Sequence, residues 1–225
     1  MPRRLLAAAV AGTLAVTGLA ACRDQPTVAA YVGSAQLTNA QVDQMLGDFA
    51  ADAPDGPGGD RIKLVSDFVV NEVSRRLAKE HGITVPAVEP GLLTDVANEM
   101  HAKLGSATTL EAESIAAYGA IAGLGTPQAP GDADKREIYN ALVAAQLAPA
   151  DQYDQYQSGL DAPQVRAALG MRPVLRDALH RYQVSVNPRY QPVGLPVLFV
   201  PVQGRNVPLL FVPLLDAPPA VVDAG

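Results

Sequence analysis

The first 22 residues of this 225-residue chain carry a pattern that separates them from the folded domain. Arg3 and Arg4 precede residues 5–21, which are all apolar or small or threonine, and the chain's single cysteine, Cys22, follows directly. A run of 17 such residues lies at the lower limit of about 17 for a membrane-spanning helix, and its glycines and threonines weaken it further. The pattern predicts a cleaved secretion signal instead of a transmembrane helix.

The end of this segment, Leu19-Ala20-Ala21-Cys22, is similar to the lipobox of bacterial lipoprotein precursors. The resemblance implies that the sulfur of Cys22 receives a diacylglyceryl group and that the chain is cut between Ala21 and Cys22. An ordinary secretory signal with a chance cysteine is the alternative. We therefore expect a signal peptide at residues 1–21, a lipidated tether at 22–26, and a mature protein anchored on the extracytoplasmic face of the cell membrane.

Charge and cysteine content limit the classes of partner. The chain has 17 basic and 23 acidic residues, and cleavage before Cys22 removes only two charges, Arg3 and Arg4, so the net charge changes from −6 to −8. Because phosphate binding needs a surplus of Lys and Arg, we expect no nucleic-acid partner. Acyl chains, and not surface charge, would then hold the protein at the membrane. One cysteine allows neither an internal disulfide nor a Cys-rich zinc site.

Short strands and helices are predicted for the first part of the mature chain. Residues 27–32 and 35–37 favour two strands around a Gly-Ser turn. Thr38 and Gln41 then fit a capping box for a helix that reaches about Phe49. We expect a loop over residues 52–59, from its Pro, Gly and Asp content.

Further apolar residues recur at helical spacing over most of the remaining chain. A helix over 60–80 is predicted with Asp60 as its N-cap and Gly82 at its left-handed end. A third helix is predicted over 90–104, with Leu104 on its buried side. The expected later helices cover 109–124, 134–147, a short turn or helix with Tyr153 and Tyr156, and 163–182 with Asp161 as N-cap and a break at Pro173.

Composition changes near residue 187. Residues 196–202 and 207–215 are apolar, β-branched and punctuated by proline, so they predict two strands around a turn at 203–206. The prolines confine such strands to edge positions or irregular extended structure. A second membrane segment is the alternative, but each half is too short to span. We expect a mainly α fold: a multi-helix domain at 27–186 with a short N-terminal β element, and a C-terminal extended or β-hairpin segment at 187–225.

Two blocks of the sequence resemble the N-terminal domain of the SurA-like periplasmic chaperones and the related PrsA-type foldases. The first is residues 28–38 with Val42 and Leu46, and the second is residues 77–85, Leu-Ala-Lys-Glu-His-Gly-Ile-Thr-Val. The resemblance implies a helical chaperone-like module that binds unfolded or secreted polypeptides. No parvulin-like set of strands follows residue 90, so proline isomerase activity is not implied.

The sequence offers little catalytic chemistry. His81, His101 and His180 lack the spacing of a metal site, so the expected set of metal ligands is empty. The glycines at 119, 123 and 125 lack the strand-to-helix context of a nucleotide-binding loop, and close helix packing or a helix cap explains them better. We expect no enzyme activity and no cofactor other than the diacylglyceryl lipid on Cys22.

Three aromatic residues are candidates for client binding. Tyr153 and Tyr156 lie among glutamines, a combination suited to partner recognition, although packing on a neighbouring helix is the stronger expectation. Phe49 is the third, with core packing as its alternative. The favoured hypothesis is a membrane-anchored holdase-type chaperone or protein-binding module without catalysis. The alternatives are a degenerate peptidyl-prolyl isomerase and a solute-binding lipoprotein of a transporter.

Overall fold

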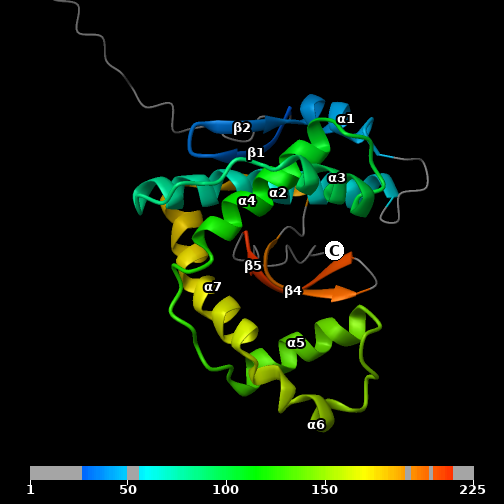
Figure 1. Ribbon diagram of the computed structural model, residues 1–225, viewed down its shortest axis with the longest axis vertical. Coiled ribbons are helices and arrows are strands. Elements are labelled where there is room, and N and C mark those ends of the chain that lie inside the picture. Colours follow the sequence, from blue (N-terminus) through cyan, green and yellow to red (C-terminus); the bar gives the residue numbers. More distant parts are fainter. Residues whose placement is uncertain (1–26, 50–55, 191–193, 203–204, 215–225) are drawn as a thin grey trace, which may run out of the picture.

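The computed structural model describes residues 27–49, 56–190, 194–202 and 205–214. Within these residues the fold is mainly helical, with seven α-helices, short N-terminal strands and a C-terminal antiparallel hairpin, which confirms the expected fold class. Two groups of elements lie toward opposite ends of the long helix α7 (Pro163–Arg181) (Figure 1). We call the strands and helices within residues 28–121, together with the strand at 185–186, the head, and the helical elements within residues 132–161 the arm.

A three-stranded sheet forms one side of the head. Strands β1 (Val28–Val32) and β2 (Ala35–Thr38) pair antiparallel, as predicted, around Gly33, whose φ of 58° lies in the left-handed region that favours glycine. Strand β3 (Ser185–Val186) pairs with the other edge of β1 and was not predicted. The η2 turn (Pro188–Tyr190) follows β3, and the Tyr190 hydroxyl donates to Asn39 Oδ1 at 2.7 Å.

Helix α1 (Asn39–Leu46) begins with the predicted capping box. The Thr38 hydroxyl accepts from the Gln41 amide at 3.2 Å, and the Thr38 amide donates to Gln41 Oε1 at 2.8 Å. Val42 and Met45 are buried, as their spacing predicts. The helix ends before Phe49, which instead forms an isolated β-bridge with Ala102.

Helix α2 (Gly56–Glu80) is the longest element, and it begins earlier than predicted. The expected loop is wrong for residues 56–59, because a proline is tolerated in the first turn of a helix, where its missing N–H needs no partner. Its C-terminal end is the predicted one. Gly82 has φ 66°, and the Ile83 amide donates to Ala78 O at 2.8 Å, as in a Schellman motif.

Helix α3 (Pro90–Glu99) stops five residues before the predicted end. His101 adopts φ 52°, which turns the chain away and leaves Leu104 64% exposed, so the predicted burial of Leu104 is wrong. Helix α4 (Ser106–Ile121) follows and lies along α2, the largest helix–helix contact of the head. Asp48 holds the start of α4, since its carboxylate accepts from the Ala107 amide at 3.1 Å.

The arm comprises α5 (Asp132–Ala144), the short α6 (Tyr153–Tyr156) and the η1 turn (Gly159–Asp161). Helix α7 (Pro163–Arg181) then returns to the head. Two details differ from prediction: Ala162 and not Asp161 occupies the N-cap position, because Asp161 pairs with Arg166 at 2.7 Å, and α7 runs unbroken through Pro173.

Two glycines allow residues 125–126, in the segment that leads into the arm, to lie against α7, the later helix that contains Gly170. A Cβ on Gly125 would collide with the backbone of Gly170, and a Cβ on Gly170 would collide with Thr126 O. The close-packing interpretation of the glycine cluster is therefore right for Gly125. It fails for Gly119 and Gly123, whose surroundings are open.

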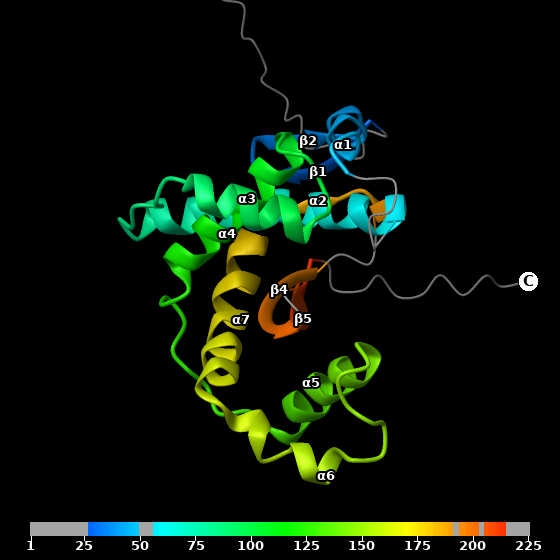
Figure 2. The same ribbon diagram turned by 45° about the vertical axis from the view of Figure 1, so that its right-hand side comes forward.

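The C-terminal hairpin consists of β4 (Gly194–Val202) and β5 (Arg205–Pro213). The strands start and end close to the predicted limits, but residues 205–206 belong to β5, so the predicted four-residue turn is too long. Its other two residues, 203–204, and position 215 lie outside the described residues. The hairpin occupies the space between head and arm beside α7 (Figure 2).

Candidate functional site

The hairpin has one buried face, and that face is aliphatic. Its side chains belong to the continuous hydrophobic core: Leu195, Val197, Leu198, Leu209, Leu210 and Val212. Each strand has two successive buried residues, Val197–Leu198 and Leu209–Leu210, at the points where the pairing register shifts. These bulges insert one extra residue in each strand and keep the aliphatic side chains on the same face.

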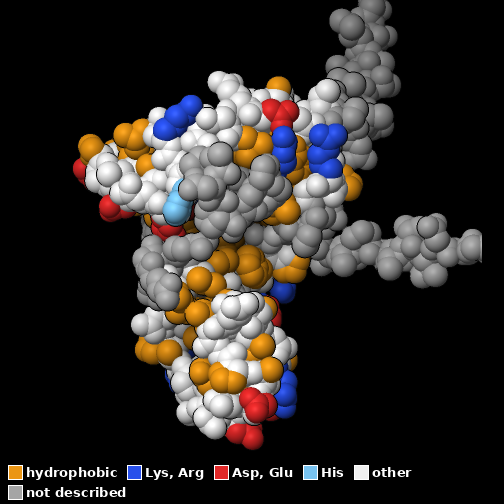
Figure 3. Space-filling model, turned by 90° about the vertical axis from the view of Figure 1, so that its right-hand side faces the viewer, with side chains coloured by type: hydrophobic (Ala, Val, Ile, Leu, Met, Phe, Trp, Pro, Cys, Tyr) orange, Lys and Arg blue, Asp and Glu red, His pale blue; other side chains and the backbone are white. Residues whose placement is uncertain are grey.

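The opposite face of the hairpin consists of prolines and phenylalanines. Pro196 lies across from Phe211, and Phe199 across from Pro208, with Pro213 at the end of β5. We call these five residues the proline–phenylalanine face. Phe199 is 42% exposed and Phe211 is 40% exposed. Hydrophobic side chains gather on the molecular surface between the head and the arm (Figure 3). A contiguous exposed apolar patch of this kind marks an interaction site more often than chance.

Proline also changes the edges of the hairpin. Within the described residues, β4 and β5 pair only with each other, so each strand has one free edge. Proline has no N–H to donate to the ladder and therefore occupies positions that point away from the partner strand. Pro196 and Pro201 in β4, with Pro208 and Pro213 in β5, thus remove donors from both free edges. A further strand could pair with these edges only poorly.

Three side chains from three helices hold the hairpin by its carbonyl groups. Ser66 in α2 donates to Gly194 O at 3.2 Å, and Tyr118 in α4 donates to Val197 O at 3.4 Å. Arg172 in α7 donates to Phe211 O at 3.3 Å. Burial raises the pKa of Tyr118 to about 12, so its hydroxyl remains a neutral donor across the physiological range.

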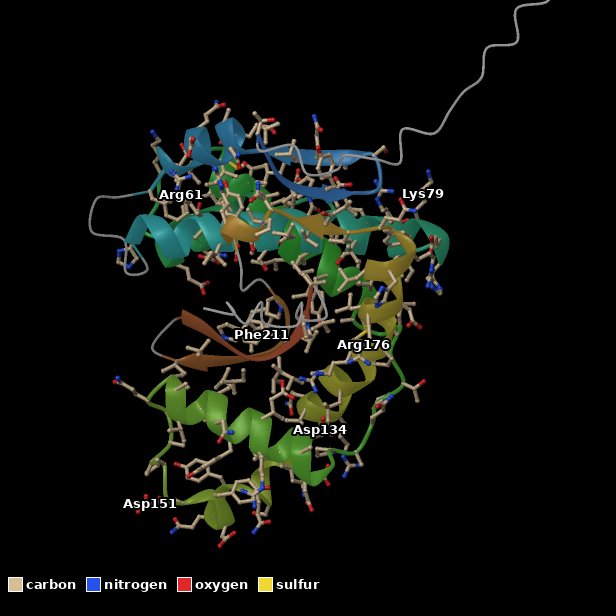
Figure 4. The ribbon with its side chains drawn as sticks, turned by 180° about the vertical axis from the view of Figure 1, so that it is seen from behind. Arg61, Lys79, Asp134, Asp151, Arg176 and Phe211 are labelled. Carbon is tan, nitrogen blue, oxygen red and sulfur yellow. The ribbon has the colours of Figure 1, made fainter. Side chains whose placement is uncertain are left out.

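Arg172 also connects the hairpin to the arm. Its guanidinium pairs with Asp134 at 3.4 Å and with Glu137, both in α5, while its side chain is only 16% exposed. Figure 4 shows Phe211 on the hairpin and Asp134 below it, where α5 approaches α7. One arginine therefore fixes α5, α7 and β5 relative to each other. Sequence reasoning assigned no role to it, because its three partners lie 35 to 39 residues away.

A cluster of charged side chains lies buried between α2 and α4. Lys63 contacts Asp67 at 3.1 Å and also pairs with Glu111 across the interface. Burial, followed by the Glu111 charge, raises the pKa of Asp67 well above its usual value. Burial opposes ionisation of Glu111 too, but the Lys63 charge and hydrogen bonds from Asp67 and Lys63 outweigh it and lower its pKa. The two carboxyl groups thus divide into one that favours the proton and one that favours the charge.

The predicted tyrosines lie at the end of the arm and pack on a third tyrosine. The ring of Tyr139 is 5.3 Å from Tyr153 and 5.6 Å from Tyr156, centroid to centroid, and Arg136 lies 4.6 Å over the Tyr153 ring. The Tyr139 hydroxyl donates to Pro149 O and accepts from the Gln152 amide. Both candidate rings are half-buried in this cluster, as the packing expectation requires, and client binding by them stays a prediction.

The third candidate, Phe49, lies at the other end of the molecule. It is half-buried and borders an open hollow of about 510 Å³ between the end of α1 and the end of α3, with Asp48, His101 and Lys103. Asp48 is already occupied, since it caps α4 and pairs with Lys103 at 3.7 Å. The structure does not bring Phe49 together with the two candidate tyrosines, which belong to the arm.

Other predicted features carry no site in the described part of the chain. His81, His101 and His180 are all exposed and belong to separate elements, and no group of three or more His, Cys, Asp or Glu is arranged to hold a metal ion there. None of the helices described is both long enough and apolar enough to cross a membrane. Ala21 and Cys22, the predicted cleavage and lipidation residues, lie outside the described residues.

Comparisons of the chain with protein-family models, with curated proteins and with solved structures found no match. The resemblance to lipoprotein precursors and to SurA-like chaperones stays a prediction from the residues quoted above.

Proposed function

We propose that this protein is a membrane-anchored, extracytoplasmic lipoprotein that binds other polypeptides as a holdase-type chaperone, without catalysis. The observation that carries the proposal is the proline–phenylalanine face. Phe199 and Phe211 expose large apolar rings, whereas most other large apolar side chains in the described part of the chain are buried. Holding an unfolded client requires such a surface, because client binding buries apolar area against it.

The form of this face suits weak and sequence-tolerant binding. Aromatic rings and prolines offer rigid apolar contact area with little side-chain entropy to lose. The missing edge donors disfavour addition of a client strand, so contact would occur through side chains. A client held only in this way can be released without breaking a strand ladder, which is what a holdase needs.

An aggregation assay tests the proposal. A chemically denatured client is diluted into buffer with a stoichiometric amount of the mature protein, and light scattering is followed. We expect the wild type to suppress scattering and the double variant Phe199→Ser, Phe211→Ser to lose most of the effect. Leu104→Ser is the matched control, since Leu104 is an exposed apolar residue on the head. A wild type without effect, or a double variant equal to the wild type, would contradict the proposal.

A further inference from the structure

We infer that the β4–β5 hairpin is an exchangeable occupant of the helical surface beneath it, and that an apolar β-forming segment of another polypeptide can take its place. The inference rests on the proposed function and names its client class. It concerns the aliphatic face of the hairpin and the helices that cover it, a different surface from the proline–phenylalanine face.

The hairpin is hydrogen-bonded as a closed unit. Its strands pair with each other and, within the described residues, with no other strand. Undocking it would therefore break no ladder shared with the rest of the fold. Strand β3 differs, because its pairing with β1 closes the sheet of the head. The hairpin is held to the helices by its aliphatic face and by a few polar contacts.

Among the described residues, the side chains of Ser66, Tyr118 and Arg172 reach backbone groups of the hairpin. Ser66, Tyr118 and Arg172 each donate to a main-chain carbonyl of the hairpin. Every polypeptide carries such acceptors, so these three donors place no demand on the side chains of a ligand. Selectivity then comes from the aliphatic face, which requires leucine or valine side chains on one face of an extended segment, two of them in succession where the register shifts.

The chain is fixed immediately before the hairpin. Tyr190 is buried, and its hydroxyl donates to Asn39 Oδ1 at the start of α1. The Asn187 amide donates to Ala29 O at 2.9 Å, which holds the same region on β1. The head therefore keeps its sheet and its helix contacts when the hairpin leaves, so exchange does not require the head to unfold, although the arm loses its contacts with β5.

The hairpin competes with any incoming segment because it is part of the same chain. A tethered ligand acts at a high effective concentration, so the hairpin is docked in most molecules. The apparent affinity for a free segment is therefore the intrinsic affinity multiplied by the fraction of molecules whose hairpin is undocked. Weakening the hairpin while leaving the helices unchanged must increase that fraction. Binding of a free segment then improves, although no residue of the receiving surface has been altered.

The test uses the full mature protein and a fluorescent peptide that copies residues 194–214. Leu210→Ala weakens the hairpin at a side chain with 0% exposure, and Leu104→Ala is the control, since Leu104 is an exposed apolar residue on the head. Val212→Ala is a milder variant that keeps the result independent of any folding defect in Leu210→Ala. We expect fluorescence anisotropy to give at least tenfold tighter peptide binding for Leu210→Ala than for wild type. Val212→Ala should be intermediate and Leu104→Ala unchanged.

Equal peptide binding by wild type, Leu210→Ala and Val212→Ala would overturn the inference. A concentration-dependent dimer without peptide binding would also overturn it, since the occupant would then be a second copy of the chain. The two proposals fail separately. If the Phe199→Ser, Phe211→Ser variant loses aggregation suppression while wild type and Leu210→Ala bind the peptide equally, the exchange fails and the proposed function stands. If Leu210→Ala binds the peptide more tightly than wild type but the wild type does not suppress client aggregation, the proposed function fails and the exchange stands.

Discussion

At the scale of single residues, the most consequential position is the only cysteine. If Cys22 carries the acyl chains, nothing else in the chain is needed to hold the protein at the membrane. The net charge of the mature protein would be −8, which anionic lipid repels. Lipidation at this one sulfur would therefore decide the location of the whole molecule.

Cys22→Ala should move the protein from the membrane pellet to the soluble fraction. The reason is that the sulfur would be the attachment point of the lipid in the proposed lipoprotein, and that no helix among the described residues is long and apolar enough to replace it. Fractionation followed by immunoblotting measures the change. Retention of Cys22→Ala in the pellet after a high-salt wash would contradict the lipoprotein assignment.

Asp67 should make the stability of the protein depend on pH. Its pKa is raised in the folded state, so its contribution is fully present below the unfolded value near 3.8 and is lost as pH rises toward the folded value. Asp67→Asn cannot ionise, so we expect it to gain stability relative to wild type as pH rises from 4 to 8. Urea unfolding across this range measures the difference.

Glu111→Gln supplies the opposite sign. The pKa of Glu111 is lowered in the folded state, so its stabilisation is present above the unfolded value near 4.5 and is lost at lower pH. This variant should lose stability relative to wild type as pH rises from the lowered pKa of folded Glu111 toward the unfolded value near 4.5. Parallel pH profiles for wild type and both variants would show that the buried cluster does not titrate as its geometry requires.

At the scale of elements, the sequence predicts local structure well and packing poorly. The Thr38–Gln41 capping box and the Gly82 helix end are set by neighbours within a few residues, and both are found in the structure. Strand β3 was missed because two residues carry no periodicity and its partner β1 lies more than 150 residues away. The exposure of Leu104 was missed because a single left-handed residue, His101, ends α3 early.

The candidate site shows the same division. Two proline-punctuated strands were predicted at 196–202 and 207–215, and the hairpin has its strands at 194–202 and 205–213. Strict alternation would have placed Phe199 and Phe211 on opposite faces of the hairpin, but the bulges at Val197 and Leu209 change the phase within the strands and bring both rings onto one face. The donors Ser66, Tyr118 and Arg172 carry no local signal, because each contacts the hairpin from a distant part of the chain.

The close contact between residues 125–126, which precede the arm, and Gly170 in α7 predicts the effect of two glycine substitutions. Gly170→Ala places a methyl group against Thr126 O, so we expect a loss of about 1–3 kcal/mol in the free energy of unfolding. Gly119→Ala is the control: it lies inside α4 with nothing near its Cβ position and should gain about 0.5–1 kcal/mol. Urea denaturation measures both. Equal effects for the two variants would contradict the close approach.

At the scale of the whole molecule, the hairpin connects parts that would otherwise touch little. Contacts from α2, α5 and α7 meet on it, and Arg172 joins the last two to β5. The head and the arm therefore owe much of their relative placement to a C-terminal element. In the proposed function this element presents an apolar face to clients, and in the further inference it also occupies a second apolar surface.

Site-specific photocrosslinking tests the central claim, that the protein binds polypeptides through the hairpin. A photoreactive phenylalanine analogue is placed at position 199, and in a second protein at position 104 on the head. Each protein is illuminated with a denatured, labelled client and analysed by gel and mass spectrometry. The account predicts client adducts from position 199 and few from position 104. Equal yields at both positions, or no adduct at position 199, would contradict it.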